Sequence, residues 1–139
     1  MKTRQLNITA ILLMMVTFFS ACNKNRDDVE IEYLKDSSKL IGKWRMTEMV
    51  TSGFLGPATS HDYSQYNIVY EFKANGIVSI SGETDDVGNH SFFFEYDKTY
   101  DLHSLKIGHQ WYLASISSGE LMLDNRPLDG SLYKLIKIK

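Results

Sequence analysis

The fold of this chain is decided by residues 66–76, which read YNIVYEFKANG. Alternation with a period of two predicts a β-strand over residues 66–73 with one apolar face. The Ala-Asn-Gly at residues 74–76 predicts a tight hairpin turn, because Asn and Gly accept the positive φ that such turns require. The apolar face of this strand carries Tyr66, Ile68, Tyr70 and Phe72.

Similar short runs rich in Val, Ile, Tyr and Phe lie on both sides of this hairpin, separated by Gly, Asn, Asp and Ser. Short strands joined by short turns predict an all-β antiparallel meander. Eight such strands can close into a small up-and-down barrel, which removes exposed edges, whereas the same alternation would also serve a two-sheet β-sandwich. The predicted strands cover about residues 43–50, 66–73, 77–81, 91–96, 104–107, 111–116, 120–124 and 132–138.

The first 21 residues read as an export signal. Lys2 and Arg4 give a basic start, and residues 8–19 form an apolar run broken only by two threonines. That run is shorter than the ~20 apolar residues that a membrane-spanning helix needs. A short apolar run behind a basic start predicts a signal peptide over residues 1–21.

Residues 19–22, Phe-Ser-Ala-Cys, resemble the lipobox of bacterial lipoproteins, although leucine is usual where Phe19 stands. The resemblance implies that Cys22 receives a lipid and becomes the first residue of the mature chain. Because Cys22 is the single cysteine, no internal disulfide can form. We therefore expect a membrane anchor at Cys22 and a place in the cell envelope, at the outer membrane, with the face left open.

The mature chain, residues 22–139, is mildly acidic. Without Lys2 and Arg4 it has 13 basic and 17 acidic residues, a net charge of −4. This balance argues against a nucleic-acid partner, which calls for a basic surface. Residues 22–36 are polar and predict a lipidated flexible tether, and residues 37–139 predict one domain. Asp27, Asp28 and Glu30 suit either a surface-sorting signal or a plain solvated linker.

Two motifs resemble the lipocalin-like domains of bacterial lipoproteins. Gly42 and Trp44 match the Gly-x-Trp that opens the first strand in that family, and Phe72 and Gly76 match its second-strand hairpin. The order and spacing of these motifs extend the resemblance from about residue 40 to residue 138. Animal lipocalins carry an arginine late in the barrel that packs over the tryptophan. Here the last strand offers only Lys134 and Lys137.

The residues that usually carry catalysis or bind metals are scattered. The four histidines stand at positions 61, 90, 103 and 109, with none of the spacings typical of zinc ligands. Glu83, Asp85 and Asp86 lie close together between two glycines, but their spacing fits no known calcium loop. We therefore expect no enzyme activity, no metal and no cofactor.

Aromatic side chains are the most distinctive feature, and they could either line a pocket or fill the core. Strands of about six residues give a barrel only ~14 Å tall, and a drug-sized pocket needs roughly 300 Å³. We therefore expect a nearly filled centre, with any ligand site at one mouth, formed by residues 51–65 and 82–90. Such a site would take a small apolar or amphipathic ligand, while the alternative is a structural or protein-binding component of an envelope assembly. The expected contacts are Tyr66, the strongest candidate, and Tyr70, Tyr96 and Trp111.

Overall fold

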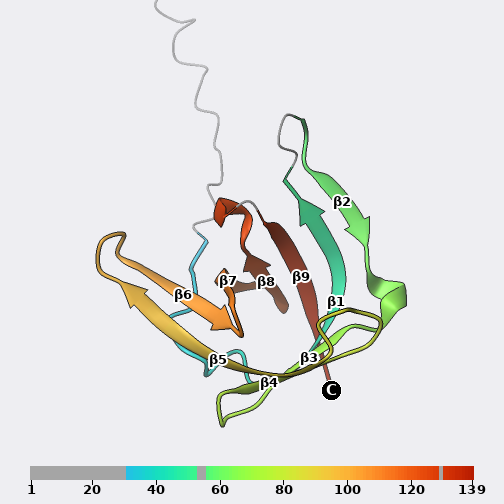
Figure 1. The fold of residues 1–139 in the computed structure, drawn as a ribbon, viewed down its shortest axis with the longest axis horizontal. Coiled ribbons are helices and arrows are strands. Elements are labelled where there is room, and N and C mark those ends of the chain that lie inside the picture. The colour runs from blue at the N-terminus through green and yellow to red at the C-terminus, as the bar shows by residue number, and fades with distance from the viewer. Residues whose placement is uncertain (1–30, 53–55, 129) are drawn as a thin grey trace, which may run out of the picture. The chain divides into compact units, whose positions relative to one another are not determined.

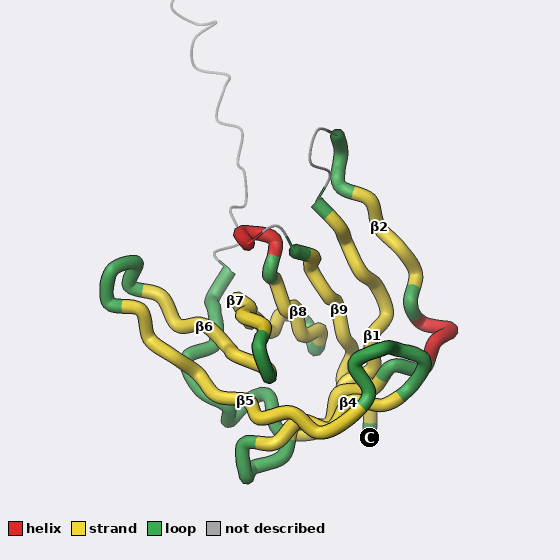
Figure 2. Tube along the Cα trace, in the orientation of Figure 1, coloured by secondary structure: helices red, strands yellow, loops and turns green. Residues whose placement is uncertain are grey.

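The computed structural model describes residues 31–52, 56–128 and 130–139. The predicted signal peptide, Cys22 and the first part of the tether lie outside the described residues. Among the described residues, two 3-10 helices, η2 (Ser64–Tyr66) and η3 (Arg126–Leu128), interrupt an otherwise all-β fold, as Figure 2 shows. The strands are β1 (Gly42–Thr51), β2 (Thr59–Asp62), β3 (Val69–Phe72), β4 (Ile77–Ser81), β5 (Gly88–Asp97), β6 (Leu102–Ile107), β7 (Gln110–Ser117), β8 (Glu120–Asp124) and β9 (Ser131–Ile138).

These strands form one antiparallel sheet that closes into a barrel (Figure 1). Closure is made by β1 and β9, which pair from Lys43 opposite Ile138 to Thr51 opposite Ser131. The opposite edge of β1 pairs first with β3 and then with β2, so these two strands share one place in the wall. The predicted eight-stranded barrel is confirmed, and the sandwich alternative is not, because the β1–β9 pairing leaves no gap between two sheets.

The strand predicted over residues 66–73 begins three residues later in the structure, as β3. Residues 64–66 form η2 instead, and Asn67 adopts a left-handed conformation with φ 51°, so the regular strand begins at Val69. The period-two pattern continues through this break and hides it, because Asn tolerates positive φ well. Tyr66 therefore does not continue the row of Tyr70 and Phe72, although its ring packs at the edge of the core.

The turn between β3 and β4 is tight, as predicted, but Asn75 contributes to it through its side chain and not through a positive φ. The Gly76 N–H donates to the Lys73 carbonyl at 3.1 Å, and Gly76 has a φ of +78°. Asn75 is not among the positive-φ residues, and its side chain instead accepts a hydrogen bond from the Ile77 N–H at 3.2 Å. In the turn that joins β3 to β4, Gly76 is therefore the one residue with a left-handed backbone conformation.

One end of the barrel is closed by Trp44. Its side chain is 1% exposed, and its indole Nε1 donates a 2.6 Å hydrogen bond to the Leu40 carbonyl. Below the ring, Phe72 and Phe92 meet edge to face with their centroids 5.1 Å apart. The amino group of Lys137 lies 5.2 Å from the centre of the Trp44 ring.

Residues 31–36, which the sequence assigns to the tether, belong to the compact unit of residues 31–139. Tyr33 forms an antiparallel bridge with Ser115 of β7, and the Leu34 N–H donates to the Ala114 carbonyl at 2.7 Å. The Leu34 side chain is only 7% exposed. A single buried leucine and an edge of β7 free to pair are enough to fix a segment whose composition is otherwise polar.

The β5–β6 hairpin reaches beyond the barrel wall (Figure 1). The first part of β5 pairs with β4 up to Ser91, and the part from Phe92 to Asp97 pairs only with β6. β6 in turn pairs with β7 only over Leu105–Ile107. Residues 92–104 are called the arm below. Its outer part, residues 95–104, has no pairing with β7, which leaves a gap in the wall beside β7.

Candidate functional site

A cavity of about 490 Å³ opens at one end of the barrel interior. Its walls include the later part of β1 and the beginning of β9, so it lies at the end away from Gly42 and Ile138. Its volume falls within the range of small-molecule sites, roughly 300–1,000 Å³. This mouth cavity is lined by Met46, Met49, Tyr63, Ile68, Tyr70, Thr84, Asp86, Gln110, Tyr112, Asn125, Gly130, Ser131 and Tyr133.

Four tyrosines dominate the wall of the mouth cavity, and each comes from a different part of the barrel. Tyr70 lies on β3, Tyr112 on β7 and Tyr133 on β9, and the strand alternation turns all three inward. The rings of Tyr112 and Tyr133 have centroids 5.9 Å apart with planes at 71°, which makes an open aromatic corner. Tyr63, which directly follows β2, is the fourth tyrosine of the lining.

A β-bulge holds Tyr63 in place. The β1–β9 register shifts between Met46 and Glu48, which leaves Thr47 as the extra residue. The Thr47 carbonyl accepts a 2.8 Å hydrogen bond from the Tyr63 N–H, and its hydroxyl donates to the Lys134 carbonyl at 3.2 Å. β-Bulges at barrel rims change the direction of nearby side chains. Here the bulge at Thr47 holds the backbone of Tyr63 through the hydrogen bond to the Thr47 carbonyl.

Three of the cavity tyrosines, Tyr70, Tyr112 and Tyr133, have raised pKa values. Burial raises the pKa of Tyr70 well above its ordinary value, and burial likewise raises the pKa of Tyr112 and of Tyr133. Neighbouring tyrosines and the negative charge of Asp86 add to each of these shifts. No hydrogen bond from the described residues contributes to the raised pKa of Tyr70 or of Tyr112.

Asp86 is the charged member of the cavity lining. It lies in the loop between β4 and β5, and its side chain is 62% exposed at the rim. His90 of β5 approaches it from outside the lining, with Nε2 3.6 Å from the carboxylate and 3.1 Å from the Asp86 carbonyl oxygen. Among the residues that the structure describes, Asp86 is the one charged side chain in the lining.

Two amides stand at the rim beside Asp86. The Asn125 Nδ2 donates to the Gln110 Oε1 at 3.2 Å, and the Asn125 N–H donates to the Ser131 carbonyl at 3.0 Å. The Asn125 Oδ1 is buried without a hydrogen-bond partner among the described residues. Buried acceptors of this kind are usually paired, so the rim presents oxygen acceptors rather than positive charge.

A second hollow of about 550 Å³ lies in the gap between the arm and β7. Exposed or half-exposed aromatic rings and carboxylates share its wall, and one of these carboxylates, Asp124, is already held by Arg126 at 2.6 and 2.9 Å. This lateral groove is lined by Glu95, Tyr96, Asp97, Lys98, Tyr100, Leu102, Ser104, Trp111, Tyr112, Leu113, Asp124, Asn125 and Pro127.

The four expected ligand contacts are not brought together. Tyr70 lines the mouth cavity, whereas Tyr96 and Trp111 line the lateral groove. Tyr66 lines neither and packs against Tyr63, with ring centroids 5.2 Å apart and planes tilted at 48°. Both segments expected at a mouth contribute to the lining of the mouth cavity, Tyr63 from residues 51–65 and Asp86 from residues 82–90.

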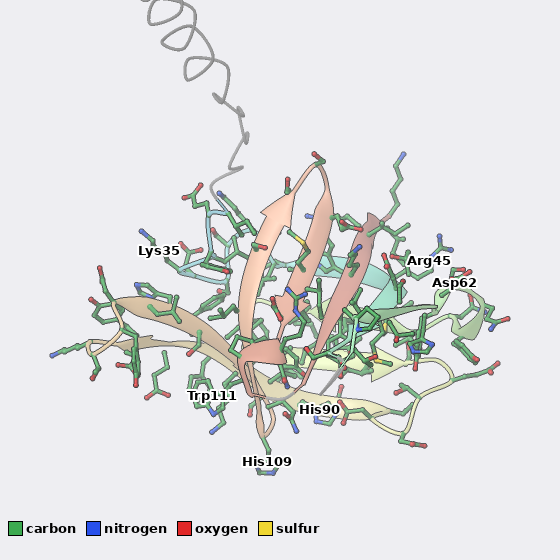
Figure 3. The ribbon with its side chains drawn as sticks, turned by 90° about the horizontal axis from the view of Figure 1, so that it is seen from above. Lys35, Arg45, Asp62, His90, His109 and Trp111 are labelled. Carbon is green, nitrogen blue, oxygen red and sulfur yellow. The ribbon has the colours of Figure 1, made fainter. Side chains whose placement is uncertain are left out.

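Trp111 faces outward and takes part in a ladder across three strands. Phe93, Lys106 and Trp111 stand opposite one another on β5, β6 and β7. The Lys106 amino group lies 4.7 Å from the Trp111 ring centre and 5.7 Å from that of Phe93. Figure 3 shows Trp111 on the opposite side of the domain from Arg45 and Asp62, which places it outside the barrel core.

Sequence reasoning missed Tyr63, Tyr112 and Tyr133. The signal for the last two was present, since Tyr112 alternates with Ala114 and Ile116, and Tyr133 with Leu135. Tyr63 carried no such signal, because it stands in a polar segment. The strand β2 within that segment, Thr-Ser-His-Asp, was missed because all four of its residues are exposed and it has no apolar face.

Within the described ranges, no group of three or more His, Cys, Asp or Glu residues is arranged to hold a metal ion. The search of the same residues for a helix long and apolar enough to cross a membrane finds none. The chain matches no protein-family model, and no curated protein and no solved structure shows significant similarity to it.

Proposed function

We propose that this protein is a lipid-anchored, lipocalin-like binding protein of the cell envelope that holds one small amphipathic ligand in the mouth cavity. The anchor is Cys22, and the membrane it serves is the outer membrane. The protein performs no chemistry on the ligand. The barrel supplies a rigid wall, and the four tyrosines supply both ring surface and hydroxyl groups.

The observation that carries this proposal is the composition of the mouth cavity. The lining combines three apolar side chains, Met46, Met49 and Ile68, with four tyrosines and with polar residues that include Asp86 and Gln110. A molecule with an apolar body and a polar end would bury the body among these residues and leave the end near Asp86 and Gln110. Ligand sites in small barrels commonly combine a largely apolar wall with a few oriented polar groups.

Native mass spectrometry of the protein extracted from its own membranes tests the proposal. We expect a retained small molecule in the wild type and its loss when Met49→Trp fills the cavity. A matched substitution in the lateral groove, Leu113→Trp, should leave the molecule bound. A retained molecule that survives Met49→Trp but disappears in Leu113→Trp would move the site to the groove and refute the mouth-cavity proposal.

A second candidate is a protein-binding component of an envelope assembly without a small ligand. The arm favours it, because Phe93, Tyr96 and Tyr100 are 48%, 44% and 77% exposed. Exposed aromatic rings are enriched where proteins meet. Under this candidate no small molecule is retained, and Tyr100→Ala abolishes co-purification of a partner that the wild type carries at fixed stoichiometry.

A further inference from the structure

We infer that the ligand of the mouth cavity is an organic cation, an ammonium group carried on an apolar body. This inference rests on the proposed function and narrows it. It follows from the charge and the ring content of the cavity lining, taken together.

The aromatic rings of the lining are the first reason to expect a cation. Tyr112 and Tyr133 meet at 71° with centroids 5.9 Å apart, and Tyr70 and Tyr63 complete the surrounding wall. The faces of tyrosine rings are negative, so a cation placed among several of them is attracted. Groups of aromatic side chains around a cavity are a known way to bind ammonium ions whose charge is covered by methyl or methylene groups.

The charge of the lining gives an independent reason. Asp86 is a carboxylate at the rim, and its influence reaches Tyr70, Tyr112 and Tyr133, whose pKa values it helps to raise. Among the described residues the lining itself has no lysine, arginine or histidine, and His90 approaches the Asp86 carboxylate to 3.6 Å from outside the lining. An anionic ligand would be repelled by Asp86 and would find no positive partner, whereas a cationic one would be attracted to it.

The remaining lining residues set the other half of the ligand. Met46, Met49 and Ile68 contact the inner part of the cavity and offer no hydrogen bond. Methionine side chains adapt to irregular apolar shapes. The ligand therefore has a flexible or compact apolar body that enters first, with the ammonium group among the tyrosines and nearest to Asp86.

The test uses residues 23–139, which contain the whole compact unit of residues 31–139, and the neutral fluorescent probe N-phenyl-1-naphthylamine. Three molecules that each have a chain of eight carbons compete with the probe: octyltrimethylammonium, octanol and octanoate. The titration is done at about pH 8. We expect octyltrimethylammonium to displace the probe at a concentration about tenfold lower than octanol, with octanoate the weakest.

Asp86→Asn is the diagnostic variant, and Asp85→Asn is its control, since Asp85 is exposed and outside the lining. Asp86→Asn should reduce the cation preference severalfold, and Asp85→Asn should leave it intact. Equal displacement by the ammonium compound and octanol, or a preference that Asp86→Asn does not change, would overturn the inference while leaving the proposed binding function standing. Failure of the wild type to bind the probe would overturn both.

Discussion

The amino group of Lys137 lies 5.2 Å from the centre of the Trp44 ring, at the end of the barrel opposite the mouth cavity. The stem of the same lysine crosses Gly42, where a Cβ would lie 3.3 Å from the Lys137 Cε. With φ at +126°, Gly42 combines an unusual backbone angle with this close approach. Gly42, Trp44 and Lys137 thus seal one end of the barrel together, which explains the spacing of the Gly-x-Trp motif.

Trp44→Ala should lower the free energy of unfolding by about 3–5 kcal/mol, because it empties a buried site and removes the bond to the Leu40 carbonyl. Urea unfolding followed by far-UV circular dichroism measures the change. Trp111→Ala is the matched control, and on the outer ladder it should cost only about 1 kcal/mol. Equal losses in the two variants would contradict the assignment of Trp44 to the closed end.

Leu34→Ala should destabilise the barrel by about 2 kcal/mol or more, because Leu34 is buried against the core. Ile31→Ala removes a similar side chain three residues earlier that is 52% exposed, so it should change stability by no more than about 0.5 kcal/mol. Thermal unfolding of residues 23–139 compares the two. If both variants unfold like the wild type, residues 31–36 do not contribute to the domain.

The ion pair between Glu48 of β1 and Lys134 of β9 predicts a pH-dependent contribution to the free energy of unfolding. The Lys134 amino group, 2.7 Å away, together with the Ser60 hydroxyl, holds the pKa of Glu48 below its ordinary value of 4.5. A carboxyl whose pKa is lower in the folded state stabilises the protein above its unfolded pKa and loses this effect as the pH falls through its folded pKa. Glu48→Gln should therefore cost up to about 1 kcal/mol at neutral pH, and the cost should fade below pH 4.5.

Glu71→Gln is the control for this prediction, since its contact with Lys43 is 4.0 Å long and exposed to solvent. Urea unfolding at several pH values should show no comparable cost for Glu71→Gln. A cost of Glu48→Gln that stays constant down to the acid limit of folding would show that its ion pair is not the source.

Cys22→Ala should release the protein from membranes, because the lipid expected from the lipobox resemblance is its anchor. Several acyl chains hold a protein firmly, whereas the polar residues 23–30 offer no apolar surface of comparable size. Metabolic labelling with an alkyne fatty acid followed by membrane fractionation checks both steps. A wild type that stays unlabelled, or a Cys22→Ala variant that stays membrane-bound, contradicts the anchor.

Much of the fold could be predicted because apolar alternation marks the inward face of a strand. The bounds of β4 and β8 coincide with the predicted ranges 77–81 and 120–124, where Val78 and Ile80, or Leu121 and Leu123, alternate with more exposed residues. Where the pattern is absent, as in the polar β2, or false, as at Tyr66, sequence reasoning fails. The left-handed conformation of Asn67 leaves the alternation of residue types unchanged, yet the regular strand begins only after it, at Val69.

The site was less predictable, because it depends on how strands far apart in sequence are staggered. Tyr70 and Tyr96 follow equally regular patterns, but Tyr70 faces the interior and Tyr96 stands on the arm, beyond the point where β5 leaves β4. Alternation tells which face a side chain takes but not how far along the barrel it lies. The convergence of Tyr63, Tyr112 and Tyr133 is a property of the closed barrel.

Binding of N-phenyl-1-naphthylamine by residues 23–139 tests the mouth-cavity account most directly, when the wild type is compared with Tyr63→Ala and Tyr100→Ala. Tyr63 lines the mouth cavity, and Tyr100 lines the lateral groove. The account predicts saturable binding in the wild type, a dissociation constant raised about tenfold in Tyr63→Ala, a loss of roughly 1.4 kcal/mol, and no change in Tyr100→Ala. Saturable binding that Tyr100→Ala abolishes and Tyr63→Ala leaves intact, or no binding by the wild type, would contradict it.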